Sequence, residues 1–423
     1  MSRIQLIRNF STDLHFVHVS RHTWLLGTAV AKILLFLGLL GILTSTIYLG
    51  LVLVAVLRFR LRPKNVPSFT PAVSLLKPLH GAEPGLRECL EGFFRLDYPD
   101  YEILFCARSE NDAGLVIARE LATKYPKIPV RILTCGEPPW PNARCYSLNQ
   151  MKAAARHEIL VITDSDVRVK AEYLRAVVDP FRREETGMVT CVYRGVAAQG
   201  GFWAQLEGLG MSVEMTSGVL VADMLEGMRF ALGPSMVVRK ECVDQIGGFE
   251  RLGDYYADDF MLGNLIAEKG KTVVLSHHAI DHCIVNTKCA KSLAHQWNWM
   301  KSTRFSRPKG HLGTGLTFGL PFGLLTFMAA SLLGHPRIGL ELLEWTVLAR
   351  VLQSMLVGWF VVKDDEAVRL AWLYPLRDLM GSILWIASYV SRRVGWRDDL
   401  FEITSGGVVR LVHAEERRAG VHH

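Results

Sequence analysis

The segment Ile159-Leu-Val-Ile-Thr-Asp164-Ser-Asp166 is an apolar run that ends in two carboxylates separated by one residue. A short, continuous apolar run is typical of a strand that is buried on both faces of a parallel sheet. In open α/β sheets, ligands bind beyond the carboxyl ends of the strands. The segment therefore predicts a buried parallel strand with a ligand site directly after it.

Asp164 and Asp166 offer the hard oxygen ligands that Mg²⁺ or Mn²⁺ prefers, and such a cation would bridge a bound diphosphate. The alternative interpretation is a solvated Asx turn that only closes the strand. The placement directly after a strongly apolar run leaves both interpretations open.

Further short β-rich runs surround this strand, and segments with helical spacing separate them, as at 113–124. Strands that alternate with helices predict an α/β domain with a mainly parallel sheet covered on both faces. We expect one large domain between about 70 and 305. The other expected strands are 72–76, 101–107, 130–134 and 188–193.

Half of the 423 residues are hydrophobic and the mean hydropathy is +0.20, which indicates that part of the chain lies in lipid. Residues 33–57 contain no charged side chain, and this run exceeds the ~20 residues that a helix needs to cross a bilayer. It is also too long for the core of a signal peptide. The run predicts a retained transmembrane anchor.

Basic residues follow the anchor at once, and an excess of positive charge marks the cytoplasmic side of a membrane. We therefore expect the region after the anchor to be cytoplasmic, on the inner membrane if the protein is bacterial. These basic residues are Arg58, Arg60, Arg62 and Lys64.

Two further apolar runs, 312–334 and 345–362, predict two more crossings, although the second contains Arg350. The last apolar stretch, 370–391, is interrupted by Arg377 and Asp378. Charges at mid-bilayer are costly unless they face protein or water, so we expect an interfacial or re-entrant placement. The predicted division is an anchor segment 1–66, a cytoplasmic catalytic domain 67–309, a membrane region 310–391 and a cytoplasmic tail 392–423.

Composition excludes several other classes of protein. The eight cysteines form no CxxC pair, so neither a zinc cluster nor a secreted disulfide scaffold is indicated. The net charge of +7 gathers beside apolar segments and forms no basic tract with interleaved aromatic residues, which argues against nucleic acid as a partner. Anionic lipid head groups and a diphosphate fit this distribution better.

A second acidic group, Asp254-Tyr-Tyr-Ala-Asp258-Asp259, precedes a helical segment at 260–269. Adjacent carboxylates at a helix start can simply cap the helix and favour its dipole. If the group faces the first acidic pair, one carboxylate could instead act as general base for an acceptor hydroxyl. The sequence leaves both roles open.

These motifs resemble those of the family-21 glycosyltransferases, which are the ceramide glucosyltransferases and related bacterial hopanoid-biosynthesis glycosyltransferases. The resemblance covers nearly the whole chain. It is carried by the opening strand Val73-Ser-Leu-Leu-Lys77-Pro78-Leu-His-Gly81, by Asn111-Asp112, by Asp164-Ser-Asp166, by Gly247-Gly248-Phe249, by Ala257-Asp258-Asp259, and by Trp396-Arg397 with Ser405-Gly406-Gly407.

The resemblance implies a GT-A fold and an inverting transfer from a UDP-sugar. It assigns Asp259 as the catalytic base and Asp164 with Asp166 as ligands of the divalent cation. It places Asp112 at the uracil or ribose side of the donor. The remaining substrate-binding residues that it implies are Lys77, Pro78 and Asp258.

Two motifs depart from the family pattern. The loop NxKxxNL reads Asn142-Ala-Arg144-Cys-Tyr-Ser147-Leu148, in which Arg144 keeps the charge but presents a planar fork. We still expect Asn142 and Arg144 to bind substrate. The motif [QR]xxRW reads His295-Gln-Trp-Asn298-Trp299, so that only Trp299 survives, and we expect it at the acceptor site or in an aromatic belt near the bilayer. Lys301 or Arg304 could replace the missing arginine.

The expected function is transfer of a hexose or N-acetylhexosamine from a UDP-sugar to the hydroxyl of a membrane lipid. The resemblance allows a sphingoid or a hopanoid acceptor, and the segment 256–263 looks slightly closer to the hopanoid branch. One alternative is a processive polysaccharide synthase, which shares the sheet and the acidic motifs. Another is a membrane protein that binds sugar nucleotides without catalysis, which the altered 295–299 motif would suit.

Overall fold

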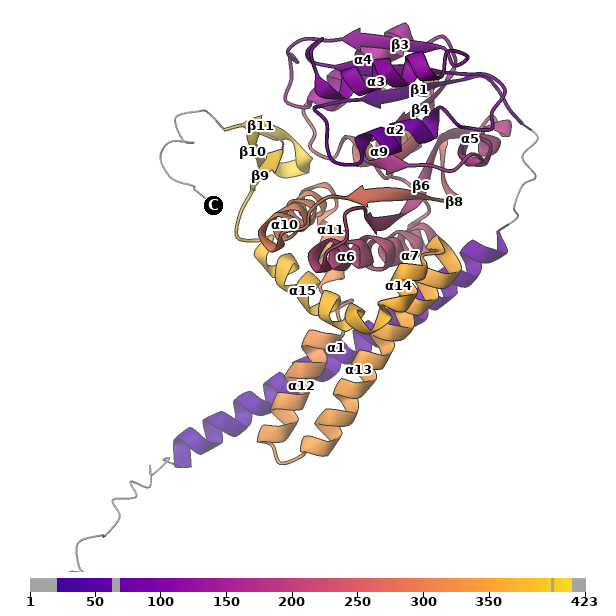
Figure 1. The fold of residues 1–423 in the computed structure, drawn as a ribbon. Helices are drawn as coiled ribbons and strands as arrows, with labels where there is room; N and C mark the ends of the chain where they lie inside the picture. Colours follow the sequence, from indigo (N-terminus) through magenta and orange to yellow (C-terminus); the bar gives the residue numbers. More distant parts are fainter. Residues whose placement is uncertain (1–20, 63–68, 397–398, 413–423) are drawn as a thin grey trace, which may run out of the picture.

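The computed structural model describes residues 21–62, 69–396 and 399–412. An α/β domain stands on a layer of helices, and three helices project from that layer at the end opposite the sheet (Figure 1). Lys64 and Arg397, which entered the sequence predictions, lie outside the described residues.

The described residues form a mixed sheet of eight strands in the order β3-β2-β1-β4-β7-β6-β8-β5. The first four strands are parallel, as are β6 and β8, whereas β7 and β5 run antiparallel to their neighbours. The strands are β1 (Val73–Pro78), β2 (Tyr101–Ala107), β3 (Val130–Thr134), β4 (Ile159–Thr163), β5 (Val167–Arg168), β6 (Thr186–Ala197), β7 (Ser235–Arg239) and β8 (Thr272–Ile284).

Strands β1, β2 and β4 are buried along their whole length, because helices cover both faces of the parallel part of the sheet. The helices of this domain are α2 (Leu86–Phe93), α3 (Ala113–Lys124), α4 (Ala143–Ala154), α5 (Tyr173–Val178), α6 (Phe202–Leu209), the π-helix η2 (Gly210–Met215), α7 (Thr216–Glu226), α8 (Lys240–Gln245), α9 (Asp258–Glu268), α10 (Cys289–Ser306) and α11 (Pro308–Thr314), with 3₁₀ turns η1 (Asp179–Arg182) and η3 (Phe249–Leu252).

The expected strands and the helix at 113–124 are confirmed, but the sequence did not predict β5, β7 or β8. In β8, residues Ser276, His277, His278, Asp281 and His282 interrupt the apolar pattern that marks the other strands. These histidines lie inside a strand that pairs with β6.

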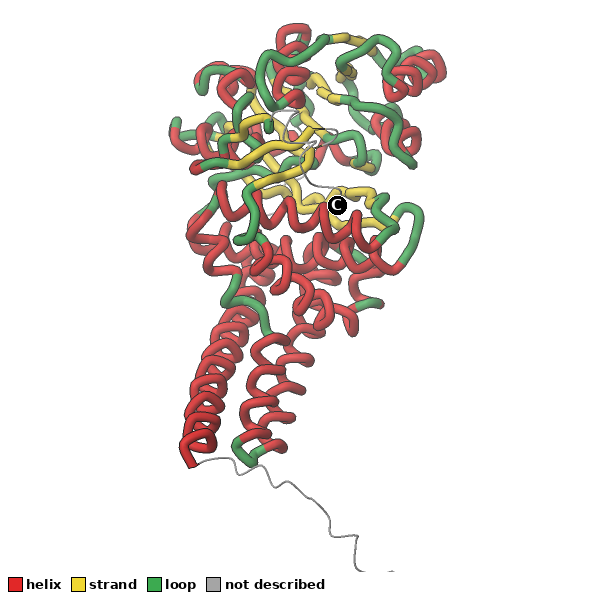
Figure 2. The backbone as a smooth tube through the Cα atoms, turned by 90° about the vertical axis from the view of Figure 1, so that its left-hand side faces the viewer, coloured by secondary structure: helices red, strands yellow, loops and turns green. Residues whose placement is uncertain are grey.

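Three helices form the projecting bundle, in which α12 (Leu320–Leu332) and α13 (Pro336–Val357) make a hairpin beside α1 (Arg21–Leu61) (Figures 1 and 2). Gly38 and Gly41 of α1 allow close packing, since a Cβ atom there would lie 2.3 Å from the Thr326 hydroxyl and 2.0 Å from the Phe322 ring.

By length and composition, two described helices could cross a membrane, namely Leu26–Leu61 and Pro336–Val362, which includes the π-helix η4 (Gly358–Val362). Helix α12 has 13 residues and spans only about 20 Å at 1.5 Å per residue. The run that predicted the second crossing is thus divided between α11, a turn and α12.

The stretch after the hairpin contains α14 (Asp365–Arg369), the turn η5 (Ala371–Leu373) and α15 (Tyr374–Ala387). Helix α15 has the opposite distribution of polar and apolar side chains to a surface helix of a soluble protein, because its charged residues Arg377 and Asp378 are buried. Its outward face carries Leu376, Ile383 and Ile386, which are 44, 56 and 61% exposed. The charges in this apolar stretch therefore face protein.

Residues of the expected tail form a second, three-stranded antiparallel sheet of β9 (Arg393–Trp396), β10 (Asp399–Ile403) and β11 (Val409–Leu411), with the turn η6 (Ser405–Gly407). This small sheet is bonded to the loop before α9. The amide of Tyr256 donates to the Gly407 carbonyl at 3.1 Å, and the amide of Val409 donates to the Asp254 carbonyl at 2.8 Å. The tail thus supports the loop that leads into Asp258 and Asp259 at the start of α9.

Candidate active site

Strand register brings the predicted site residues to one edge of the sheet. Leu76 pairs with Ile162, so the end of β1 lies level with the residues that follow β4. Thr163 pairs with Ser235, the first residue of the antiparallel strand β7, so the turn at Gly233 reaches the same edge. The two acidic motifs, far apart in sequence, meet there.

Arg144 joins the two acidic motifs from the first turn of α4. Its Nε donates to Asp164 Oδ1 at 3.0 Å, and its Nη2 donates to the Gly233 carbonyl at 3.2 Å. Its Nη1 donates to Asp258 Oδ2. The planar fork of an arginine presents its N–H donors in fixed, diverging directions, which suits this three-way contact better than the point charge of a lysine does. The substitution in the NxKxxNL loop therefore has a structural role here.

Asn142 caps α4 and binds the second acidic motif. Its Oδ1 accepts from the Cys145 amide at 3.0 Å, while its Nδ2 donates to the Tyr255 carbonyl at 3.0 Å and to Asp258 Oδ1 at 3.2 Å. Both oxygens of Asp258 are therefore bonded, one to Asn142 and the other to Arg144. Asp258 holds the loop in place, and its neighbour is freer to react.

Asp259 lies at the start of α9 and is only half-buried. Its Oδ2 accepts from the Gly233 amide at 2.7 Å and its Oδ1 accepts from the Phe260 amide at 2.7 Å. Burial, followed by the nearby charge of Asp258, raises the pKa of Asp259 to about 6. A carboxylate with that pKa is a stronger base than an ordinary aspartate and is still ionised at neutral pH.

Asp166 has a carboxylate oxygen without a partner. Its Oδ1 is buried and has no hydrogen bond among the described residues, whereas its Oδ2 lies 3.4 Å from His282 Nε2. An unpaired buried carboxylate oxygen beside Asp164 fits a divalent cation. No cluster of three or more metal-binding side chains occurs in the described ranges, so phosphate and water would complete the coordination.

Lys77 is fully buried at the end of β1, one residue before Pro78 closes the strand. Its ammonium group donates to the Asp164 carbonyl at 2.6 Å and lies 4.0 Å from the centre of the Phe93 ring. Burial lowers the pKa of Lys77 to about 8. Through this bond Lys77 supports the backbone of the Asp164-Ser-Asp166 segment, the DxD motif.

Asp112 is the N-cap of α3, and both of its oxygens accept backbone bonds. Oδ1 accepts from the Gly114 amide at 2.8 Å and Oδ2 accepts from the Gly81 amide at 2.8 Å. Gly81 has a φ of 66°, which favours glycine at this turn. Asp112 thus ties the loop after β1 to the start of α3, at the same edge of the sheet.

The residues predicted on α10 are not all at this edge. Trp299 reaches Asp166 only through His282. Its ring lies 6.3 Å from the ring of His282, which is the partner of Asp166, and 4.4 Å from the ring of His295. Lys301 is buried, donates to the Arg393 carbonyl and lies over the Trp297 ring.

Arg304 donates to the Ser388 carbonyl at 2.7 Å and lies over the Tyr389 ring. Neither Lys301 nor Arg304 bonds to the acidic residues within the part of the chain that the structure describes. Both cations support the end of α15 and the C-terminal sheet, whereas Arg144 bonds to carboxylates of both acidic motifs.

His282 lies beside Asp166, and the sequence motifs did not indicate it. Its strand β8 pairs with β5, and this pairing places His282 opposite Val167, one residue after Asp166. The only sequence signal was a histidine near other histidines, and it was too weak because β8 itself was not predicted.

The sheet and its acidic edge define a glycosyltransferase of the GT-A class. The sequence model of glycosyl transferase family 21 matches residues 37–409, and the chain belongs to that family.

Relatives with assigned functions agree with this membership. The chain is 27% identical over 359 residues to ceramide glucosyltransferase 1 of Caenorhabditis elegans, covering 83% of this chain and 76% of the relative. It is 25% identical over 363 residues to ceramide glucosyltransferase 3 of the same organism, covering 83% and 77%.

Among solved structures, the fold is similar to that of a mannosyltransferase from Pyrobaculum calidifontis in complex with GDP-Man and Mn²⁺. The TM-score is 0.50 and the sequence identity is 18%, with 82% of this chain and 99% of that chain covered. At this identity the similarity concerns the fold alone.

Proposed function

We propose that this glycosyltransferase moves glucose from UDP-glucose to the primary hydroxyl of a ceramide-type lipid, with inversion at the anomeric carbon. The observation that carries the proposal is the separation of roles at the acidic edge. Asp258 is bonded to the side chains of Asn142 and Arg144, whereas Asp259 is held by two backbone amides and has a pKa raised to about 6. The ceramide glucosyltransferases among the relatives favour the acceptor.

On the donor side, Asp164 and Asp166 would hold a divalent cation. When bound, such a cation neutralises the negative charge of the diphosphate leaving group as a Lewis acid. Arg144 fixes Asp164 at the end of β4, and His282 holds the second oxygen of Asp166. Asp112 orients the loop after β1, where the nucleoside would lie.

On the acceptor side, Asp259 removes the proton of the lipid hydroxyl while that oxygen attacks the anomeric carbon. The attack comes from the face opposite the diphosphate, so a single displacement inverts the configuration. The two backbone amides that bind Asp259 hold its carboxylate in one orientation. Trp299 would lie along the acceptor, since it reaches the site through His282.

Helix α1 is proposed to cross the bilayer and the α12–α13 hairpin to enter it beside α1, with the catalytic domain on the cytoplasmic side. The basic end of α1 meets the catalytic domain, where Arg58 donates to the Met224 carbonyl at 3.2 Å and Arg62 pairs with Asp223. Cytoplasmic membrane ends are rich in such residues. The apolar outward face of α15 would lie in the cytoplasmic leaflet of the bilayer. A lipid acceptor in that leaflet would then reach the site from the membrane.

The test is to reconstitute the chain in vesicles that contain ceramide or a hopanoid alcohol and to add radiolabelled UDP-glucose or UDP-N-acetylglucosamine. Solvent extraction then separates lipid from polymer. We expect label from UDP-glucose in a lipid that carries one sugar. Label in an insoluble polymer would favour a polysaccharide synthase, and donor binding without turnover of either acceptor would favour a non-catalytic protein.

A further inference from the structure

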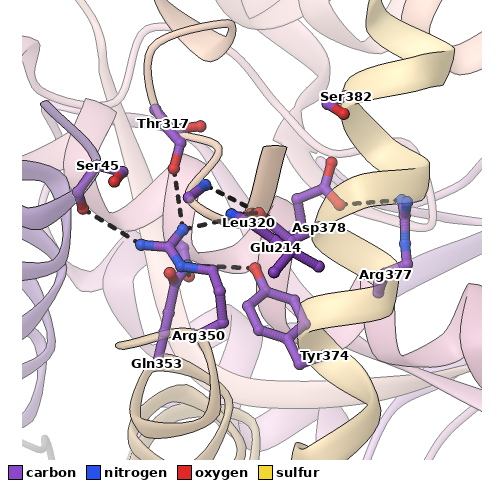
Figure 3. Close-up of polar contacts among 12 residues, drawn as sticks. Ser45, Glu214, Thr317, Leu320, Arg350, Gln353, Tyr374, Arg377, Asp378 and Ser382 are labelled. Atoms are coloured by element: carbon purple, nitrogen blue, oxygen red, sulfur yellow. Dashed lines mark hydrogen bonds and ion pairs between the residues drawn. The ribbon is translucent and has the colours of Figure 1, made fainter. Parts of the chain in front are cut away.

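A buried polar cluster lies where the catalytic domain meets the membrane helices (Figure 3). We call it the membrane junction. It brings together residues of η2, α13 and α15, which are Glu214, Arg350, Gln353, Tyr374, Arg377 and Asp378. Two of these, Arg377 and Asp378, are the charges that interrupt the last apolar stretch of the sequence.

One side of the junction binds the membrane helices. Arg350 of α13 donates to the carbonyls of Thr317 and of Ser45 in α1, at 2.9 and 3.2 Å. Asp378 accepts the amides of Gly319 and Leu320 at 2.8 Å each, and so caps the start of α12. Asp378 therefore fixes α15 to the helical hairpin.

The other side of the junction binds the catalytic domain. Arg377, next to Asp378 on α15, forms an ion pair with Glu214 of η2 at 3.0 Å. Its guanidinium group passes between two glycines, because a Cβ atom on Gly210 would lie 2.2 Å from Nε and one on Gly381 would lie 3.2 Å from Nη1. The surrounding backbone is thus shaped around Arg377.

The π-helix η2 connects this junction to the candidate active site. Met215 follows Glu214 and accepts a hydrogen bond from the Tyr193 hydroxyl at 2.7 Å. The Tyr193 ring stacks on His282, which contacts Asp166. π-helical turns are rare and occur frequently at functional sites.

Two further bonds hold this region to the membrane side. Ser212 of η2 donates to Asp364, which caps α14, at 2.6 Å. Gln353 of α13 donates to the hydroxyl of Ser217, two residues after η2, at 2.9 Å. The same short segment therefore contacts the helical hairpin, α14 and α15.

We infer that the Glu214–Arg377 pair is a positioning contact, which sets the height of the catalytic carboxylate above the bilayer. The inference rests on the proposed function, because a lipid acceptor has to reach Asp259 from the membrane. Neighbouring residues of α15 hold the domain through Arg377 and the hairpin through Asp378. Loss of the first contact removes the ion pair between η2 and α15. The domain stays attached by α1 and by the bonds of Ser212 and Ser217, but η2 can shift relative to α15 and the acceptor.

The experiment uses the full chain in vesicles and the variants Glu214→Gln and Arg377→Gln. The probes are long-chain ceramide, which stays in the bilayer, and a short-chain ceramide that disperses in water. A small misplacement of a reacting group can cost a factor of about 100, so we expect kcat/KM for long-chain ceramide to fall by about 10-fold to 100-fold. The short-chain acceptor and the affinity for UDP-glucose should be unchanged.

The matched control is Arg131→Gln, which breaks an ion pair with the buried Glu102 at 3.4 Å in the outer part of the sheet. This control should lower thermal stability without changing the ratio of the two acceptors. The variant Arg377→Lys keeps the charge and should recover part of the long-chain activity. An equal loss for both acceptors in the junction variants would overturn the inference.

Hydrogen exchange in the same vesicles gives a readout that needs no turnover. Glu214→Gln should raise amide exchange in both η2 and α15, whereas Arg131→Gln should raise it in neither. Unchanged exchange in η2 and α15 would contradict the inference. If the wild-type chain glycosylates neither ceramide, the proposed acceptor is wrong, and the exchange result still decides whether the pair joins the two regions.

Discussion

Two arginines, Arg144 and Arg350, each bind backbone and carboxylate from distant parts of the chain, yet their surroundings differ. Arg144 contacts Asp164, whose side chain is 31% exposed, whereas Arg350 contacts Asp378, which is 3% exposed. The cluster around Arg144 includes the partly exposed Asp164, and the neighbouring Asp166 has a buried carboxylate oxygen without a partner among the described residues. Both carboxylate oxygens of Asp378 are bonded to protein. The first cluster has the features expected of a ligand site, whereas the second holds helices together.

The largest expected effect is the loss of the proposed base at the cluster around Arg144. Asp259→Asn should lower the transfer rate by about 10² to 10⁴, which is the usual contribution of a general base. Binding of UDP-glucose should stay close to wild type, because the base acts on the acceptor. Radiolabel transfer and calorimetric binding measure the two quantities. Asp254→Asn is the nearby control, and an active Asp259→Asn enzyme would remove this residue from the role.

A second prediction concerns the cation. Removal of divalent ions with EDTA should abolish transfer, and Mg²⁺ or Mn²⁺ should restore it. Asp166→Ala removes a metal ligand, whereas His282→Ala removes only a residue that orients this ligand. Changes of the second kind cost about 10-fold to 100-fold in metal affinity, so Asp166→Ala should weaken UDP-glucose binding more than His282→Ala does. Full activity in EDTA would show that the carboxylates serve another purpose.

The third prediction concerns the cluster around Arg350 in the membrane junction. Asp378→Ala leaves Arg350 buried without its carboxylate and exposes the start of α12, and breaking a buried pair costs about 3–5 kcal/mol. We expect a clear drop in the unfolding temperature in detergent. Arg87→Gln removes an exposed pair with Glu120 and serves as the control, because such pairs contribute only about 0–1 kcal/mol. Equal melting temperatures for the two variants would contradict the distinction between the clusters.

The smallest expected effect is the pH dependence. Asp259 acts as a base only when ionised, so kcat/KM should rise as the pH increases through about 6. Lys77 loses its charge as the pH increases through about 8, which should weaken the support of the DxD backbone and lower kcat/KM. A bell-shaped profile should result, and Lys77→Arg should move its alkaline limb upward. A profile that is flat between 5 and 9 would argue against both assignments.

Much of the donor half was predictable because local signals coincide there. Strand β4 is a pure apolar run, and Asp164 and Asp166 follow it directly, so strand position and chemistry can be inferred together. The long uncharged run in α1 was equally clear. The β8 strand was missed because its polar side chains break the apolar pattern. His277 and His278 pack beside the core residues Phe59 and Tyr173, and His282 contacts Asp166.

The sequence by itself determined the parallel strands, the acidic motifs at their ends and the apolar length of α1, since these depend on neighbouring residues. Only the tertiary structure decided which carboxylate is held by charged and polar side chains and which by backbone amides, because Asn142 and Arg144 reach Asp258 across more than a hundred residues. It also decided that Lys301 and Arg304 serve the C-terminal elements, and that Arg377 and Asp378 face protein. Long-range packing determines which group a charged side chain contacts, and the spacing of residues in the sequence does not show it.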